Sequence, residues 1–204
     1  MNRYFLLHPD NRFYTICALE ARLEFTYLPQ IAFESAQDRI DVQSRGEKKR
    51  TNNEVSAQSQ TLGKQLIKKI EADTLPAVSI RWINERVGYG LFAEEDLEEG
   101  SYAGEYTGIV RKNDRRHFEP LNNYCFEYPV PDEIGRSFVI DATQGNLTRF
   151  INHSFSPNLK PFHVFHDDFY HLIFLAVCPI KKGEQLSFDY GINYWYIREP
   201  PQEF

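Results

Sequence analysis

Cysteine is scarce in this sequence, and the few cysteines are far apart. Cys17, Cys125 and Cys178 are the only three in 204 residues, and none belongs to a CxxC pair. This spacing excludes a disulfide framework and any zinc site built from cysteine alone. It also favours a reducing compartment as the place where the protein works.

Long apolar runs are missing as well. No stretch approaches the roughly 20 residues that a membrane-spanning helix needs. The first ten residues, MNRYFLLHPD, become polar too soon for a secretory signal. We therefore expect no membrane partner.

A surplus of positive charge is the third absence. Acidic residues outnumber basic ones by 29 to 23, which gives a formal net charge of −6. This balance argues against direct binding of a nucleic-acid backbone. It would favour a basic partner, although simple solubility is the commoner reason for an acidic balance. Aromatic residues, by contrast, are abundant, because 16 Phe and 12 Tyr are available to line a pocket.

The first region, residues 1–75, has no assignable motif. Residues 37–59 are so polar that we expect an exposed loop there. Its basic cluster, QSRGEKKRTNNE, could be a nuclear-targeting patch, although a solvated run of charge is the commoner meaning. The region could pack against the rest of the chain, form a homodimer or select substrates.

One helix is expected in this first region. Leu62, Leu66 and Ile70 recur at helical spacing and predict an amphipathic helix that ends near Asp73. Pro76 would close it.

The second region, residues 76–204, consists of short stretches rich in β-branched and aromatic residues, separated by turn signals. No helical crossover pattern of a parallel sheet intervenes, so a mainly β domain is expected. The stretch HVFHDDFYHLIFLAV predicts a hairpin whose loop is HDD.

Four motifs follow one another in this second region. They are GYG (88–90), GEYTG (104–108), RFINHSFSPN (149–158) and GEQLSFDYG (183–191). A lone GxG is weak evidence, because glycine serves many tight turns. The four motifs in this order and spacing resemble the SET-domain protein-lysine methyltransferases, with Gln185 where the family often carries Glu.

The resemblance covers about the last two-thirds of the chain. It implies a mainly β, clip-like SET fold of short sheets, in which the C-terminal segment threads beneath another loop. A small α-containing N-terminal region would be added to this fold. Threading is rare, so the sequence pattern alone would not predict it.

The resemblance also implies that S-adenosylmethionine is the cofactor. Asn152 and His153 would hold its amino-acid end, with Arg149 nearby. The predicted cofactor-binding residues are Val87, Gly88, Tyr89, Gly90, Arg149, Asn152, His153 and Trp195. Asn152 and His153 also have a plain structural use, since short polar side chains can pair with backbone groups where segments cross.

Tyr190 is the predicted central catalytic residue, because the resemblance places its hydroxyl beside the transferring methyl group. Tyr124 and Tyr106 would form further walls of the lysine channel, although Tyr106 could equally be a core residue. Phe188 stands where the family carries Phe or Tyr. A phenylalanine lacks the hydroxyl that limits methyl addition, so dimethylation or trimethylation is expected.

Metal binding is not expected. Many chromatin-directed relatives carry zinc-binding cysteine clusters, but Phe155 stands at one such position and no CxCxxxxC follows Tyr190. Aromatic residues of the C-terminal tail could cover the lysine channel instead, or could pack for stability only. These residues are Tyr194, Trp195 and Tyr196.

The hairpin stretch FHVFHDDFYH also invites a metal hypothesis. It contains His163, His166 and His171 together with Asp167 and Asp168. Residues of a hairpin tip and of its strands need not converge, so a solvated tip is the expectation.

The predicted function is S-adenosylmethionine-dependent methylation of lysine in a basic protein, such as a histone or histone-like tail. The acidic run AEEDLEEG (93–100) supports such a substrate through charge complementarity. The alternatives are a non-catalytic binding module with the same fold and a methyltransferase of a non-histone protein.

The chain is also similar to small zinc-free SET proteins of bacteria, including secreted chlamydial effectors that methylate histones. We expect it in the cytoplasm or directed to the nucleus. For a bacterial source, export into a host cell without a classical signal peptide is the corresponding expectation.

Overall fold

The computed structural model describes residues 4–113, 122–131, 137–196 and 198. The end of the predicted second region, residues 199–204, lies outside these ranges. Of the helices in the described ranges, none combines the length and apolar character that a membrane crossing requires.

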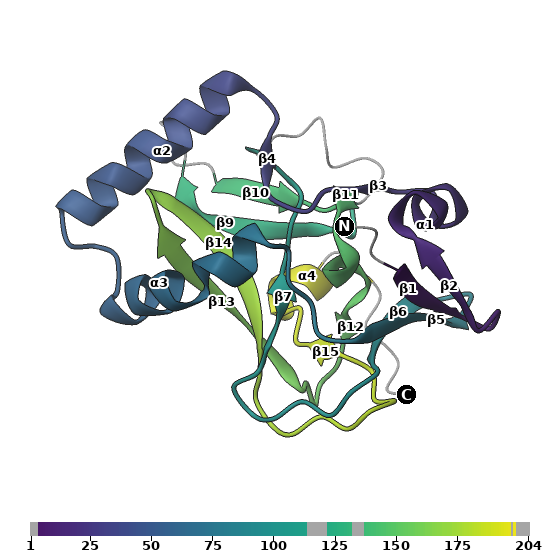
Figure 1. The fold of residues 1–204 in the computed structure, drawn as a ribbon. Coiled ribbons are helices and arrows are strands. Elements are labelled where there is room, and N and C mark those ends of the chain that lie inside the picture. The colour runs from purple at the N-terminus through teal and green to yellow at the C-terminus, as the bar shows by residue number, and fades with distance from the viewer. Residues whose placement is uncertain (1–3, 114–121, 132–136, 197, 199–204) are drawn as a thin grey trace.

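Three small sheets and two further strand pairs make up most of the fold, which confirms the predicted mainly β class (Figure 1). The first sheet runs in the order β2 (Arg12–Thr15), β1 (Tyr4–His8), β5 (Val78–Asn84), β6 (Gly88–Ala93). The second runs β4 (Ala32–Phe33), β8 (Ile109–Lys112), β10 (Ser137–Asp141), β9 (Cys125–Pro131). The third runs β13 (Leu159–His166), β14 (Phe169–Ala176), β7 (Tyr102–Glu105). The pairs are β3 (Thr26–Tyr27) with β11 (Gln144–Gly145) and β12 (Asn152–His153) with β15 (Ser187–Phe188).

The first region shares these sheets with the second. Strand β1 pairs in parallel with β5, β3 pairs with β11, and β4 pairs with β8. Each of these pairings joins a strand before residue 75 to one after it. The inner faces of the sheets meet in one core, where Leu91, Phe138, Ile140 and Phe174 are almost fully buried. Burial of such side chains is the main stabilising contribution to the fold.

Within the described residues, the helices are α1 (Ile16–Leu23), α2 (Ala36–Thr51), α3 (Ala57–Glu71), the 3₁₀ helix η2 (Leu147–Phe150) and α4 (Ile192–Trp195). The predicted helix around Leu62 to Ile70 is confirmed as α3. It begins at the N-cap Ser56, whose hydroxyl accepts a hydrogen bond from the Ser59 backbone.

The prediction of an exposed loop at residues 37–59 is wrong for most of its length. Helix α2 occupies it as far as Thr51, starting from the N-cap Ser35, whose hydroxyl accepts from the Asp38 backbone. Gln, Arg, Glu and Lys are good helix formers, so a highly polar composition is compatible with a helix that buries a narrow stripe. Asp38, Val42 and Gly46 form that stripe.

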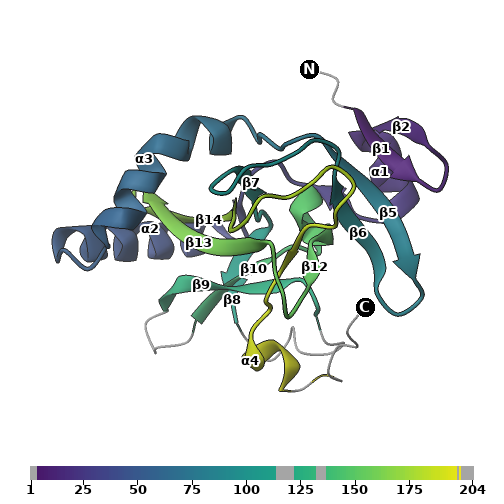
Figure 2. The same ribbon diagram turned by 90° about the horizontal axis from the view of Figure 1, so that it is seen from below.

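Both long helices lie directly on the β13–β14 hairpin (Figures 1 and 2). A Cβ at Gly46 would come within 1.9 Å of the Asp168 carbonyl oxygen, and one at Gly63 within 2.2 Å of the Phe165 carbonyl oxygen. Glycine is therefore required at both positions, because any side chain would push the helix away from the hairpin.

The predicted hairpin is confirmed, with its turn at Asp167 and Asp168. Both residues have positive φ, as a two-residue turn between twisted strands requires. The expectation of a solvated tip is wrong for Asp168, whose carboxylate accepts from Nε of Arg50 on α2 at 2.7 Å. Packing of α2 over the turn leaves the Asp168 side chain 19% exposed, whereas Asp167 is 87% exposed and solvated as expected.

Candidate active site

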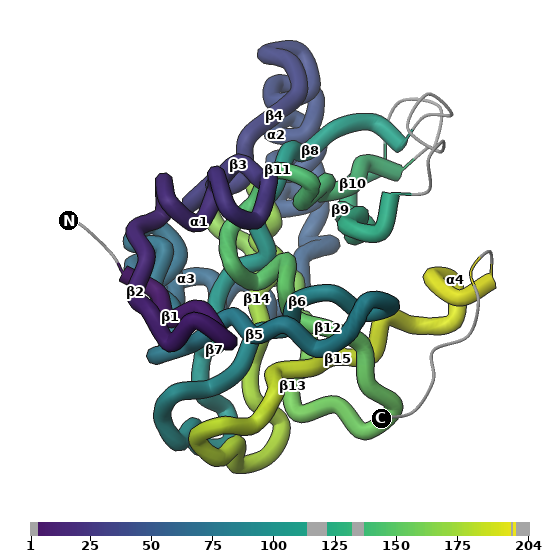
Figure 3. Tube along the Cα trace, turned by 90° about the vertical axis from the view of Figure 1, so that its right-hand side faces the viewer, coloured from purple at the N-terminus to yellow at the C-terminus, as the bar shows by residue number. Residues whose placement is uncertain are grey.

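Two motifs that are far apart in the sequence meet in the middle of the molecule (Figure 3). Strand β12 pairs in parallel with β15, so that Asn152 lies opposite Ser187 and His153 opposite Phe188. The Ser154 backbone N–H continues the pairing to the Phe188 carbonyl oxygen at 3.1 Å. The third and fourth motifs, RFINHSFSPN (149–158) and GEQLSFDYG (183–191), are thus joined by backbone hydrogen bonds.

The segment that contains β15 passes between two neighbours and is bonded to both. On one side, the Leu186 N–H donates to the Leu91 carbonyl at 2.8 Å. On the other, the Asn158 side chain accepts from the Ser187 N–H at 2.9 Å and donates to the Gln185 carbonyl at 2.8 Å. Asparagine thus supplies the partners that a strand crossing leaves unpaired.

Asn152 and His153 connect this crossing to the first and last motifs. The Asn152 amide donates to the Tyr89 carbonyl at 3.2 Å. Nδ1 of His153 accepts from the Tyr190 backbone N–H at 3.1 Å, which places the imidazole proton on Nε2. Burial lowers the pKa of His153, and the nearby carboxylate of Asp189 opposes this shift only in part. A neutral imidazole is therefore favoured.

Tyr190 lies at the centre of an aromatic cluster. Its hydroxyl donates to the Ile151 carbonyl at 2.9 Å. Its ring centroid lies 4.7 Å from that of Phe188 and 5.4 Å from that of His153. Burial raises the pKa of the Tyr190 hydroxyl well above its ordinary value, so the phenol keeps its proton. We call the set Ile151, Asn152, His153, Phe188 and Tyr190 the cleft floor.

The other predicted channel residues lie beside this floor. Phe188 is 5% exposed and packs against Phe126 and Phe174. Tyr106 is also buried, and its hydroxyl donates to the backbone carbonyl of Tyr124 at 2.8 Å. Tyr106 therefore serves as core and as channel wall together, and its hydroxyl is already bound within the protein.

Arg149 extends from η2 towards the same space. Its Nε donates to the Ala142 carbonyl at 2.8 Å, and its guanidinium lies 4.0 Å from the Tyr124 ring centroid. Burial lowers the pKa of Arg149 below its ordinary value, although the group stays charged at neutral pH.

The turn that carries Arg149 is anchored from the first region of the chain. Asn146 caps η2 by accepting from the Thr148 N–H at 3.1 Å, and its own amide donates to the buried carboxylate of Asp73 at 3.2 Å. Asp73 also accepts from the hydroxyl of Tyr27 on β3. Residues that precede the four motifs in the sequence therefore stabilise the conformation of the site.

An aromatic pair of α4 lies against Tyr190. The Trp195 ring is nearly parallel to that of Tyr190 at 6.1 Å, and the Tyr194 ring lies 4.7 Å from it. Tyr196, the third predicted aromatic residue of the tail, is 88% exposed, so the prediction that it could cover the site is wrong. We call Tyr194 and Trp195 the cleft cover.

The cleft floor, the cleft cover and Arg149 border one open cleft with a volume of about 1310 Å³. The predicted residues that line it are Val87, Gly88, Tyr89, Tyr106, Tyr124, Arg149, Asn152, His153, Phe188, Tyr190 and Trp195. Gly90 is not among them. A Cβ at Gly90 would lie 3.0 Å from the Asn152 amide nitrogen, so this glycine sits behind Asn152 and lets it approach β6.

Several lining residues had no signal in the sequence. Leu23 and Glu24 come from the end of α1 in the first region, and Arg198 comes from the tail after α4. No motif contains them, and only the packing of distant segments brings them to the cleft.

The histidine-rich hairpin makes other contacts. Nδ1 of His171 pairs with a Glu105 carboxylate oxygen at 2.7 Å, and Nε2 of His163 lies 3.2 Å from the Glu127 carbonyl oxygen. Within the described ranges, no group of three His, Cys, Asp or Glu residues is arranged to hold a metal ion.

Two unpaired polar atoms test whether a cofactor would fit the cleft. Nε2 of His153 and Nε1 of Trp195 are buried and have no hydrogen-bond partner among the described residues. Buried donors without partners are costly unless a ligand or water satisfies them. With the charged Arg149, they offer positive and donating groups to a ligand that carries acceptor oxygens and nitrogens.

Known proteins are similar to this chain in the region that forms the cleft. The family profile of the SET domain matches residues 88–191, which are 104 of the 204 residues. Histone-lysine N-methyltransferase EZH2 of Chaetomium thermophilum is 38% identical over 119 residues, covering 54% of this chain and 8% of that protein. Human histone-lysine N-methyltransferase EHMT1 is 36% identical over 117 residues, covering 55% of this chain and 9% of that protein.

Solved structures show the same similarity. A crystal structure of the Chaetomium thermophilum polycomb repressive complex 2 matches with a TM-score of 0.53 and 33% identity, covering 63% of this chain and 17% of that chain. The same complex in an autoinhibited conformation bound to S-adenosylmethionine matches with a TM-score of 0.52 and 28% identity, covering 66% of this chain and 18% of that chain. The chain therefore spans less than a tenth of the two protein relatives named above and under a fifth of these structures.

Proposed function

This chain belongs to the SET-domain family, and on that premise we propose that it is a protein-lysine N-methyltransferase that uses S-adenosylmethionine. One observation carries the proposal. The β12–β15 pairing gathers Asn152, His153 and Tyr190, which come from two separate motifs, at a single cleft lined by aromatic rings.

The cleft residues fit the cofactor that the family uses. When bound, S-adenosylmethionine supplies an electrophilic methyl group on a positively charged sulfur. Asn152, His153 and Arg149 would hold its polar end. Trp195 and the backbone from Val87 to Tyr89 would form the walls around the rest of the cofactor. Gly90 lies behind the wall formed by that backbone.

The lysine that accepts the methyl group must be uncharged. Its ordinary pKa is about 10.4, so removing the proton at pH 7 costs about 4 to 5 kcal/mol. Phe188, Tyr106 and Phe126 offer an apolar aromatic lining, which favours the neutral amine by desolvation. The channel itself therefore supplies part of the cost of deprotonation.

Tyr190 would orient the amine rather than take its proton. Its raised pKa makes it a poor base at neutral pH. Because its O–H already donates to the Ile151 carbonyl, the phenol oxygen is free to accept a hydrogen bond from the amine. Holding nucleophile and methyl carbon in line removes a large part of the entropic barrier.

Phe188 bears on how many methyl groups are added. It is buried beside Tyr190 and has no hydroxyl to hold a water or the amine. A methylated amine can then rotate back into line, so dimethylation or trimethylation is expected. Phe188→Tyr should shift the products towards monomethyl-lysine, as read by mass spectrometry. Phe188→Leu, which adds no hydroxyl, should keep the wild-type pattern, and an unchanged pattern in Phe188→Tyr would refute the assignment.

The expected substrate is a basic protein, a histone or histone-like tail. The names of the relatives and the net charge of −6 support it. The acidic run 93–100 supports it less than its sequence suggested. Glu94 pairs with Arg81 at 2.8 Å, and Asp96 pairs with Lys181 at 2.8 Å, so two of its five carboxylates are paired with cations within the protein. Such a substrate would place the protein in the nucleus or cytoplasm, and export from a bacterium remains a prediction, as does a homodimer.

Incubation with methyl-labelled S-adenosylmethionine and a lysine-rich protein mixture tests the function. Mass spectrometry before and after incubation should reveal methylated lysine in a histone. Label on another protein would favour the non-histone alternative. No transfer, together with no cofactor binding in calorimetry of the folded protein, would favour the non-catalytic module and overturn the proposal.

A further inference from the structure

The cleft cover contacts the floor through its rings, and one arginine ties it to a second segment of the chain. Helix α4 has only four residues, none of them buried, and no side-chain cap. An isolated helix of this length is unstable in water. Its position against Tyr190 is therefore expected to need contacts made elsewhere in the tail in addition to its own ring contacts.

Arg198 makes such contacts, and its guanidinium bridges two segments. One guanidinium nitrogen, Nη1, donates to the Tyr194 carbonyl at 2.9 Å. The other two nitrogens point to the turn before β9. Nε donates to the Asn123 side chain at 3.0 Å, and Nη2 donates to the Asn122 carbonyl at 2.9 Å. The guanidinium also lies 4.0 Å from the Tyr194 ring centroid.

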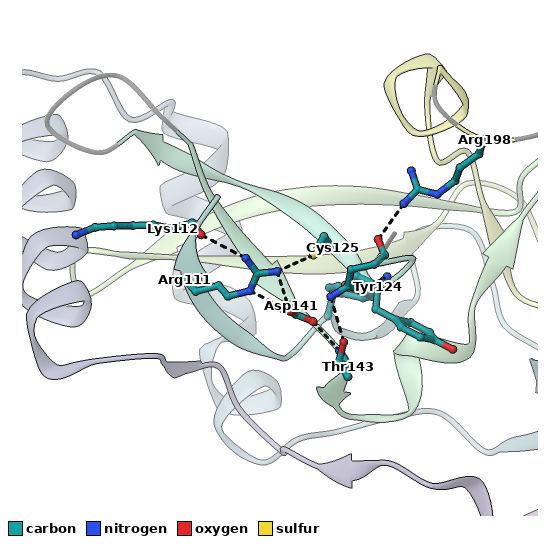
Figure 4. Close-up of polar contacts among 9 residues, drawn as sticks. Arg111, Lys112, Tyr124, Cys125, Asp141, Thr143 and Arg198 are labelled. Carbon is teal, nitrogen blue, oxygen red and sulfur yellow. Dashed lines mark hydrogen bonds and ion pairs between the residues drawn. The ribbon is translucent and has the colours of Figure 1, made fainter. Parts of the chain in front are cut away.

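The turn that receives Arg198 makes further hydrogen bonds within the domain. Asn122 donates to the hydroxyl of Thr143 at 3.2 Å, and the Thr143 N–H donates to the carboxylate of Asp141 at 3.0 Å. Asp141 pairs with the buried guanidinium of Arg111 at 2.9 Å (Figure 4). A chain of polar contacts therefore runs from the second sheet to the tail.

We propose that Arg198 is a positioning residue, which fixes the cleft cover on Tyr190 by tying Tyr194 to the turn at Asn122 and Asn123. The expected effect of Arg198 on turnover rests on the proposed function. Arg198 reaches the turn with a planar fork of donors that lysine cannot reproduce. Without it, Trp195 would leave Tyr190 and the cleft would open to water.

The first test follows Trp195 directly and needs no activity. The chain has two tryptophans, so Trp82→Phe leaves Trp195 as the single emitter. In that background, Arg198→Ala should shift the emission to longer wavelength and raise acrylamide quenching roughly twofold or more, because Trp195 becomes solvated. Arg50→Ala is the matched control, since Arg50 also binds a side chain, Asp168, but borders no part of the cleft.

The second test separates binding from chemistry. Arg198→Ala should lower kcat/KM for S-adenosylmethionine roughly 10- to 100-fold, mostly through a raised KM. Arg198→Lys should recover only part of the loss, and Arg50→Ala should stay within twofold of the wild type. Thermal unfolding of Arg198→Ala near the wild-type midpoint would show that the fold is intact.

The possible outcomes separate the two proposals. A wild type that binds no cofactor and transfers no methyl group defeats the proposed function, while the fluorescence result still decides whether Arg198 holds Trp195. An active wild type with unchanged Trp195 quenching in Arg198→Ala overturns the positioning role, whatever happens to turnover. A full rescue by lysine would equally contradict the role of the fork.

Discussion

The cleft floor and the cleft cover are both aromatic, but different interactions hold them in place. The floor is fixed by strand pairing between β12 and β15 and by burial, so that Ile151 and Phe188 are at most 5% exposed. The cover belongs to a four-residue helix with no buried residue, attached through the side chain of Arg198. The floor should therefore be rigid and coupled to folding, whereas the cover can be released without unfolding the protein.

Removal of the Tyr190 hydroxyl tests the floor and should have the largest effect. Tyr190→Phe loses the group that orients the amine, and kcat should fall roughly 100-fold with little change in KM for the cofactor. Steady-state kinetics with a protein substrate whose lysine is methylated in the reaction measures this change in kcat. Tyr14→Phe, which loses a hydrogen bond to Asp10 outside the cleft, is the matched control. A Tyr190→Phe variant with wild-type turnover would remove Tyr190 from the mechanism.

A change far from the cleft should affect stability alone. Gly63→Ala places a Cβ 2.2 Å from the Phe165 carbonyl oxygen, so α3 must shift off the hairpin at a cost of about 1 to 3 kcal/mol. Urea unfolding should show the loss, and the activity per folded molecule should stay unchanged. Gln65→Ala, at an exposed position of the same helix, should be nearly neutral. A loss of turnover without a loss of stability would mean that α3 contributes to the site.

Loss of Trp195 tests the cover. Trp195→Ala should raise the KM for S-adenosylmethionine about tenfold, because burial of an indole beside a ligand is worth about 1 to 2 kcal/mol. The free energy of unfolding should change little, since the helix buries no residue. Tyr196→Ala alters the next aromatic residue, which is 88% exposed, and should have no effect. Equal effects of the two substitutions would refute the assignment of the cover.

The pH dependence of the floor gives the smallest expected effect. The pKa of His153 is lowered in the folded protein, so its contribution to stability is complete above its ordinary value of about 6.5. As pH falls below that value towards the folded pKa, the unfolded chain takes up the proton first and the contribution is lost.

Comparison of unfolding free energies at pH 7.5 and 5.5 measures this effect. The drop should be smaller in His153→Gln than in the wild type, since glutamine does not titrate. An identical drop in both proteins would mean that other groups carry the pH dependence, for example His163, whose pKa burial also lowers.

The sequence predicted the regular parts of the fold well and the helix α2 badly. Short β-branched and aromatic stretches became strands, and the spacing of Leu62, Leu66 and Ile70 became α3. Helix α2 was missed because its buried stripe consists of little more than Val42 and Gly46, and Gly46 is buried only because a hairpin turn from residue 168 lies on it. That contact is tertiary and leaves no periodic apolar signal.

The sequence by itself determined the chemistry that is available. The order of its motifs identifies the family, and the side chains at positions 152, 153, 188 and 190 set which donors, acceptors and rings the cleft can contain. The tertiary structure alone decided what surrounds them. It brought Leu23 and Glu24 from α1 to the cleft, anchored η2 on Asp73, and placed Arg198 across the cleft on Asn122 and Asn123. The last two of these contacts join residues more than 70 positions apart in the sequence. Such contacts depend on the geometry of the whole chain rather than on any local pattern.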